Sequence, residues 1–216
     1  MNSENAVTSA ARAHSEFEKC WHDPNATRFE LPVIGVNEIL SKRYIMKPET
    51  NLTRSMIWDM ECKKALDPST YVPYVISEAG LWGRRQLSDG CDHFIRWSTQ
   101  KAWLSEQRGR VIESVFIDHS NQRIIFLGLT ETRSEEGKTI AAADYQPLVH
   151  VEHAAGGSEH NPYNLWKIVF LTDGKNERYT RPIEEMAAAG FLPGYLEIYV
   201  EKDLNVQLTR RYSENP

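Results

Sequence analysis

Val111-Ile-Glu-Ser-Val-Phe-Ile117 and Arg123-Ile-Ile-Phe-Leu-Gly-Leu129 are two β-rich runs joined by Asp118-His-Ser-Asn-Gln122. β-Branched and aromatic residues favour strands, and the polar residues between the runs are typical of a reversing turn. Residues 111–129 therefore predict an antiparallel hairpin.

The pattern continues downstream of this hairpin. Further β-rich runs cover Pro147–Ala154 and Leu165–Leu171, with a glycine-containing loop between them. The Asp173-Gly174 pair indicates another turn, after which Arg178–Ile183 is predicted as a strand. The middle of the chain is therefore predicted to be an antiparallel meander.

Upstream of the hairpin, two segments have ambiguous periodicity. In residues 54–62, Met56, Trp58, Met60 and Cys62 occupy every second position, which favours a strand. A helix remains open there, because several of these apolar residues also have helical spacing. Residues 91–104 fit a helix and a strand equally well.

Helices are predicted at three other places. Asp67-Pro68 is an N-cap followed by a first-turn proline, so residues 71–76 favour a short helix. Residues 36–44 favour another, and the apolar spacing in residues 191–208 predicts a closing C-terminal helix. Residues 1–50 are interpreted as an N-terminal extension that packs across the core or lies loose.

Length and composition predict one domain, which covers residues 51–216, and the predicted helices and antiparallel strands make its class α+β. The chain has 216 residues, of which 41% are hydrophobic and 25% charged, as in ordinary globular proteins. No apolar run reaches the roughly 18 residues that a membrane span needs. The first residues lack a secretory signal, so we expect a cytoplasmic protein that does not bind membranes.

Charge and motifs argue against several function classes. The formal net charge of −5 gives no basic face for a nucleic acid. Cys20, Cys62 and Cys91 are scattered, so we expect reduced thiols rather than disulfides or a zinc site. Dinucleotide, ATP and nucleophile-elbow motifs do not occur. We therefore expect no cofactor.

The strongest candidate for chemistry is the run Val149-His-Val-Glu-His153. On a strand, His150 and Glu152 share one face and His153 lies on the other. An imidazole beside a carboxylate is a plausible acid/base pair at neutral pH. The face that lines a pocket therefore decides whether His150 and Glu152 or His153 is the catalytic candidate. The alternative is that His150 and Glu152 face solvent and have no catalytic function.

Other polar residues are weaker candidates. Asp59 lies in an aromatic and sulfur-rich run, where it assists catalysis or faces solvent. A metal site would need a third ligand from His93, His119 or His160, and no spacing selects one. We therefore predict no metal.

Ligand-binding candidates are mainly aromatic, since small-molecule pockets usually combine aromatic walls with a few polar groups. Arg96 is the candidate anchor for an anionic group, and Tyr145 has a hydroxyl that can polarise a carbonyl. The remaining candidates are large aromatic residues: Trp58, Trp82, Trp97, Trp103, Tyr163 and Trp166.

The segment from Trp166 to Met186, with its aromatic run, Asp-Gly-Lys turn and Arg-Pro-Ile-Glu-Glu, resembles the SnoaL-like and nuclear-transport-factor-two-like superfamily. That resemblance implies a strongly curved antiparallel sheet wrapped around helices, with a pocket inside the cone. A START-like helix-grip domain is the close rival, because residues 56–62 resemble its first strand and residues 191–212 its long final helix.

The resemblance also implies a function. Many SnoaL-like proteins are cofactor-independent cyclases, dehydratases or isomerases, and others are not catalytic. The implied function is thus a lyase, isomerase or cyclase of secondary metabolism that acts on an apolar oxygenated small molecule. The alternative is a non-catalytic ligand-binding or dimerisation module of the same fold. A homodimer is expected by the same analogy.

Overall fold

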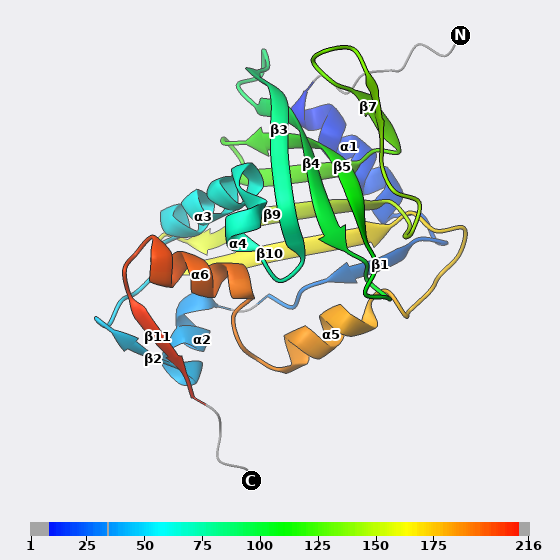
Figure 1. Ribbon diagram of the computed structural model, residues 1–216. Helices are drawn as coiled ribbons and strands as arrows, with labels where there is room; N and C mark the ends of the chain where they lie inside the picture. The colour runs from blue at the N-terminus through cyan, green and yellow to red at the C-terminus, as the bar shows by residue number, and fades with distance from the viewer. Residues whose placement is uncertain (1–8, 34, 212–216) are drawn as a thin grey trace.

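The main element of the structure, a computed structural model that describes residues 9–33 and 35–211, is a curved antiparallel sheet. Its strands are β1 (Thr27–Glu30), β3 (Ile76–Gln86), β4 (Asp92–Lys101), β5 (Arg108–Asp118), β6 (Arg123–Gly128), β9 (Val149–Ser158) and β10 (Asn161–Phe170). They are ordered β1-β10-β9-β6-β5-β4-β3. In Figure 1, β3 and β4 run steeply, whereas β9, β10 and β1 run nearly across the view, so the sheet is strongly twisted.

The structure confirms the predicted hairpin of β5 and β6. In its turn, the Asp118 side chain accepts a hydrogen bond from the backbone N–H of Asn121 (3.0 Å), and Gln122 takes a positive φ of 48°. The third predicted run forms β9, which pairs with β6 so that Phe126 lies opposite Val151. The ambiguous residues 91–104 contain β4, which pairs with β5.

The prediction of a strand at residues 54–62 is wrong, because α3 (Arg54–Leu66) occupies this segment. The Thr53 side chain caps the helix by accepting from the N–H of Met56 (3.1 Å). Trp58 packs against two core clusters, one with Met60 and the other with Ala65. Because the helix packs on more than one side, apolar residues occur around much of its surface. In the sequence they fall at every second position, which is also the pattern of a strand. The predicted cap of the next helix is confirmed, since Asp67 caps α4 (Pro68–Tyr71), but the helix predicted at residues 71–76 is wrong, because α4 ends at Tyr71 and β3 begins at Ile76.

The C-terminal part contains two helices where the sequence predicted a strand and one long helix. α5 (Arg181–Ala188) replaces the strand predicted at residues 178–183, because Pro182 lies in its first turn, where a proline is well tolerated. The closing helix is α6 (Gly194–Lys202), shorter than predicted. Gly190, with a φ of 69°, separates the two helices.

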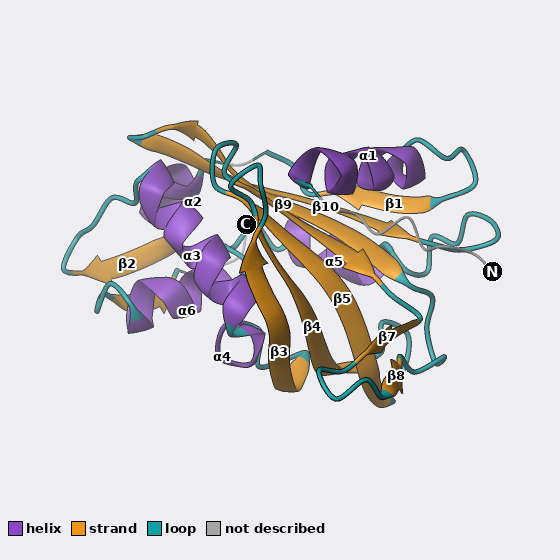
Figure 2. Ribbon diagram, turned by 90° about the horizontal axis from the view of Figure 1, so that it is seen from above, coloured by secondary structure: helices purple, strands orange, loops and turns teal. Residues whose placement is uncertain are grey.

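Residues predicted as an extension contribute to the sheet and cover it. α1 (Ala10–Trp21) packs on β5, β6 and β9, and β1 pairs with β10. Figure 2 shows α1 on the side of the sheet opposite to α5. We call the face under α1 the outer face and the other the inner face. The remaining elements are α2 (Val36–Arg43) and two small sheets, β2 (Tyr44–Lys47) with β11 (Gln207–Arg210) and β7 (Glu131–Arg133) with β8 (Thr139–Ala141).

Strand alternation sorts the residues of β9 between the two faces. Val149 and Val151 pack with inner-face residues, and Val151 also contacts the cluster that contains Phe126. The outer face carries another cluster, in which Phe17 of α1 meets Leu127. Helices α3, α4, α5 and α6 cover the inner face and leave space for a cavity between themselves and the sheet.

Candidate functional site

A cavity of about 220 Å³ lies between the inner face and the helices that roof it. Most of its wall is apolar, with Val75, Phe126, Val151, Ile168 and Ile183 among the lining residues. A smaller polar group completes the lining: Lys64, Arg96, Gln100, Glu113, His153 and Tyr195. An apolar chamber with a few grouped polar side chains is the usual form of a small-molecule site.

Arg96 and Glu113 form a buried ion pair on the cavity wall. They lie opposite each other on β4 and β5, and both Nε (2.9 Å) and Nη2 (2.6 Å) of Arg96 donate to Oε2 of Glu113. Nη1 of Arg96 donates to the carbonyl oxygen of Ala65 (3.2 Å), and the guanidinium lies 4.5 Å from the ring centre of Phe126. Within the described part of the chain, Oε1 of Glu113 accepts no hydrogen bond, so it is available to a ligand.

A second buried cluster joins α3 to β9. Nζ of Lys64 lies 2.6 Å from Oε2 of Glu61 and 2.9 Å from Nδ1 of His153. Oε1 of Glu61 accepts from the side-chain amide of Asn164 (2.6 Å), whose oxygen accepts from the hydroxyl of Tyr195 (2.7 Å). Glu61 is fully buried and Lys64 is 4% exposed. Buried charges are stable only when paired and hydrogen-bonded, as these are.

Burial and charge set the protonation states of this cluster. Burial, and next the Lys64 ammonium, lower the pKa of His153 to about 4, so the ring is neutral at pH 7. Burial lowers the pKa of Lys64 to about 8 although Glu61 opposes the shift. Burial alone would raise the pKa of Glu61, but the adjacent Lys64 charge brings it down to about 2.

The hydrogen bond from Lys64 also determines the tautomer of His153. An ammonium group can only donate, so Nδ1 of His153 accepts and the ring proton is on Nε2. Among the described residues no partner binds Nε2. The ring stacks on Trp166, with centroids 5.7 Å apart and planes at 18°. His153 therefore presents a fixed N–H donor beside the cavity.

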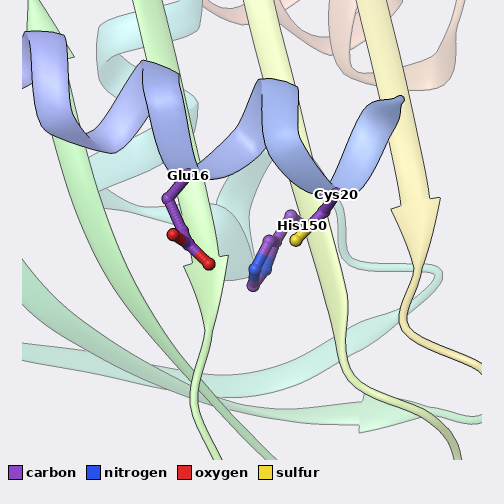
Figure 3. A group of neighbouring side chains, drawn as sticks. All are labelled: Glu16, Cys20 and His150. Carbon is purple, nitrogen blue, oxygen red and sulfur yellow. The ribbon is translucent and has the colours of Figure 1, made fainter. Parts of the chain in front are cut away.

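His150 and Glu152 lie on the outer face, away from the cavity. Nδ1 of His150 accepts from the backbone N–H of Gly128 (3.1 Å), and Figure 3 shows its ring beneath α1, beside Glu16 and Cys20. The expectation that these two residues form an acid/base pair in the pocket is corrected by the alternation of β9. That alternation points Val149, Val151 and His153 inward instead.

Glu152 is buried on the outer face, and its Oε2 accepts no hydrogen bond from the described residues. Its carboxylate lies 3.5 Å from Nδ1 of His14, 3.5 Å from Nε of Arg123 and 3.8 Å from Nζ of Lys167. These contacts tie α1 to the outer face. Three basic groups thus lie within 4 Å of this buried carboxylate and balance its charge.

Two groups under α1 have the composition of metal sites: Glu16, Cys20 and His150, and separately His14, Glu18 and Glu152. In the first, the amide of Gly128 donates to Nδ1 of His150, so the ring proton is on Nε2 and blocks that nitrogen as a ligand. Burial, and next Glu16, raise the pKa of the Cys20 thiol, whereas a metal binds a thiolate. Neither property favours a metal at this group.

Asp59 and Trp58 are on α3, outside the cavity lining. Asp59 is partly exposed; it accepts from the hydroxyl of Tyr199 (2.9 Å) and pairs with Lys63 (2.8 Å). Trp58 packs edge-on against His119, with centroids 5.7 Å apart. Because the segment is a helix that places neither residue in the lining, the expectations that Asp59 assists catalysis and that Trp58 binds the ligand do not hold for this cavity.

Of the predicted aromatic residues, some line the cavity and others lie outside it. Trp166 lines the cavity, as does Trp103, which packs edge-on against Phe170. The indole of Trp82 donates to the carbonyl of Arg133 (3.2 Å). The other predicted aromatic residues also lie outside the lining: the Trp97 indole faces Gly80, the Tyr145 hydroxyl donates to Gln100 and Gly109, and the Tyr163 hydroxyl accepts from Asn161.

Sequence reasoning missed Lys64, Glu61 and Glu113. Glu61 and Lys64 share a face only on a helix, three residues apart, and the signal for that helix was the capping residue Thr53. Glu113 was recognisable as an isolated charge in an apolar strand, but its pairing with Arg96 depends on the register of β4 and β5.

The strand order, with the first strand beside the last and helices closing the inner face, is a helix-grip α+β fold around a cavity. No family model and no curated protein matches this sequence. Among solved structures, it is similar to the Zhui aromatase/cyclase from Streptomcyes sp. R1128, with a TM-score of 0.51 and 10% identity over 82% of this chain and 95% of that one. This similarity shows the fold alone.

Two other structures match with lower TM-scores. TTHA0849 from Thermus thermophilus has a TM-score of 0.44, with 12% identity over 83% of this chain and 97% of that one. The di-domain ARO/CYC StfQ from the steffimycin biosynthetic pathway has a TM-score of 0.46, with 8% identity over 88% of this chain and 53% of that one.

The resemblance to the SnoaL-like superfamily is therefore wrong, and the helix-grip rival describes the fold. The hairpin from Trp166 to Met186, on which the resemblance depended, does not form because its second half is α5. The predicted α+β class, with a curved antiparallel sheet and helices, is confirmed. Within the described residues, no helix is long and apolar enough to cross a membrane.

Proposed function

We propose that this protein binds an apolar, oxygenated small molecule in the inner cavity and catalyses its cyclisation with loss of water, by acid–base chemistry without a cofactor. The observation that carries the proposal is the group of polar atoms on an apolar wall: the guanidinium of Arg96, Oε1 of Glu113 and Nε2 of His153. A structure of the same fold is named an aromatase/cyclase, which supports a cyclase of secondary metabolism.

The substrate class follows from the chemistry available. Closing a carbon ring without a cofactor requires removal of a proton from a carbon between carbonyl groups and attack on another carbonyl. A poly-β-carbonyl compound has such carbons, and its flat ring product suits a chamber bordered by Trp103 and Trp166. The volume of about 220 Å³ is small for a ligand site, which favours a short substrate.

Each polar group has a specific role in this proposal. Oε1 of Glu113 accepts the carbon-bound proton, and the free N–H groups of Arg96 stabilise the enolate oxygen. The carbanion forms a bond to the second carbonyl carbon, whose oxygen is protonated by the Nε2–H of His153. Loss of this hydroxyl as water, with a further carbon-bound proton, completes the ring, and the proton held by Glu113 returns to His153 so that both groups regain their starting states. The apolar walls strengthen these interactions by excluding water.

The test uses the N-acetylcysteamine thioester of 3,5,7-trioxooctanoate, in which the carbon between the thioester and the first ketone can attack the most distant ketone to close a six-membered ring with loss of water. Ring products are followed by liquid chromatography and mass spectrometry. We expect product formation to fall by roughly 10²–10³-fold in Arg96→Gln and Glu113→Gln, the usual effect of losing one such group. Binding is measured by quenching of tryptophan fluorescence with 1,8-dihydroxynaphthalene. Quenching without any turnover of the thioester would instead indicate a non-catalytic binding protein, the second hypothesis from the sequence.

A further inference from the structure

Lys64 is a primary amine at the wall of an apolar cavity. It is 4% exposed, and it belongs to the lining of the chamber in which the proposed ligand binds. The adjacent Lys63 provides a contrast within the same helix, since its side chain is 41% exposed and its ammonium is held by Asp59 and Asp203 at 2.8 Å each. Burying a lysine in an apolar chamber lowers the stability of the folded protein, so stability alone does not explain the position of Lys64.

Charged and titratable groups surround Lys64 from each packed element. Glu61 of α3 and His153 of β9 contact its Nζ, while the ring centre of Tyr195 from α6 lies 3.8 Å away. Arg96 of β4 adds a positive charge that lowers the pKa of Lys64. Burial is the larger cause of this lowering, to about 8, so a useful fraction of neutral amine is present at mildly alkaline pH.

We propose that Lys64 is an imine-forming residue that reacts covalently with an aldehyde or ketone ligand in the cavity. The inference deepens the proposed function, on which it rests, by requiring a carbonyl carbon of the ligand at Nζ of Lys64. It adds a covalent route to the acid–base route of Arg96 and Glu113.

The step balances with one proton taken from solvent, equivalent to the one that the Lys64 ammonium releases when it becomes neutral. The neutral amine attacks the carbonyl carbon, a C–N bond forms, and the carbonyl electron pair moves to oxygen, which takes the proton that the nitrogen loses. The nitrogen of the resulting carbinolamine then expels the hydroxyl, which departs as water with the proton from solvent and leaves a protonated imine. Its positive charge takes the place of the Lys64 ammonium beside Glu61 and over the Tyr195 ring, so the buried carboxylate stays paired.

Two neighbours assist proton movement in this step. Oε2 of Glu61 at 2.6 Å and Nδ1 of His153 at 2.9 Å are both acceptors for the proton that Nζ loses when the C–N bond forms. Either group can return it to the departing oxygen. The protonated imine then withdraws electrons from the next carbon, which makes its C–H bond more acidic and aids carbon–carbon bond formation.

The experiment traps the imine with 2-naphthaldehyde and sodium cyanoborohydride, followed by intact mass measurement and peptide mapping. Binding of the aldehyde alone is first measured by fluorescence quenching. We expect one rapid adduct, on Lys64, at least tenfold faster than on Lys63, with a rate that rises with pH toward about 8. Lys63→Arg should label normally, whereas Lys64→Arg and Lys64→Met should lose this adduct.

Each contrary result has a definite meaning. Quenching without an adduct on Lys64 in the wild type overturns this inference but leaves the proposed function intact, and so does equal labelling of Lys63 and Lys64. Absence of quenching by both 2-naphthaldehyde and 1,8-dihydroxynaphthalene contradicts the proposed function as well. Because the comparison of Lys63 with Lys64 is made in the wild-type protein, it remains decisive even if the Lys64 variants fail to fold.

Discussion

Nζ of Lys64 lies 2.9 Å from Nδ1 of His153, although the two residues are 89 positions apart in the chain. This contact connects α3 to β9 at the cavity and gives His153 its tautomer, with the proton on Nε2. Burial, and next the positive charge of this ammonium, lower the pKa of His153 and keep the ring neutral. The Nε2–H donor of His153 on β9 thus depends on a contact with Lys64 on α3.

The neutral state of His153 predicts a loss of stability in mild acid. The pKa is about 4 in the folded protein and 6.5 in the unfolded chain, so the unfolded chain binds more protons between these values. Stability should therefore fall as the pH is lowered from 6.5 to 4, by about 2–3 kcal/mol for this residue. Urea unfolding across this range should show a weaker pH dependence in His153→Gln than in wild type. The exposed His160→Gln is the control, and equal pH dependence in all three would contradict the prediction.

The Glu61 and Lys64 pair should show strong coupling in a double-mutant cycle. Glu61→Gln or Lys64→Met alone leaves a buried charge without its partner, which is expected to cost about 3–5 kcal/mol. The double variant removes both charges and should cost less than the sum of the single changes. Free energies of unfolding from urea titration measure each term. Additive single effects would show that the 2.6 Å contact contributes no coupling.

The two faces of the sheet should differ in their effect on ligand binding. Arg96→Lys loses the paired donation from Nε and Nη2 to Glu113, so we expect at least tenfold weaker binding of 1,8-dihydroxynaphthalene. Glu152→Gln on the outer face should change affinity less than twofold, because its carboxylate contacts His14, Arg123 and Lys167. A larger loss of affinity in Glu152→Gln than in Arg96→Lys would mean that the ligand binds on the outer face.

Filling the cavity should block binding without unfolding the protein. Val151→Phe adds volume on the inner face, where about 220 Å³ is empty, so the change in stability should stay within about 1.5 kcal/mol. Quenching by 1,8-dihydroxynaphthalene should weaken at least tenfold. Val33→Phe, at an exposed position, is a matched control of the same substitution and should bind normally. Normal binding by Val151→Phe would mean that the ligand lies elsewhere.

Local sequence signals were sufficient for the elements whose period and turns agree. The hairpin of β5 and β6 has β-rich runs and a turn whose Asp118 side chain binds the backbone, so it was predictable from a short stretch. The cap and proline of α4 were predictable for the same reason. α3 was not, because contacts with two clusters surround it with apolar residues and hide its helical period.

The sequence by itself determined the antiparallel sheet, the division of His150, Glu152 and His153 between two faces, and an apolar, aromatic-rich composition suited to a pocket. Only the tertiary structure decided that His153 faces the cavity, since α1 covers one face and α3 to α6 roof the other. It also decided the partners, Lys64 for His153 and Glu113 for Arg96. Alternation along a strand fixes which side chains share a face, but packing between distant segments chooses the face and brings the charges together.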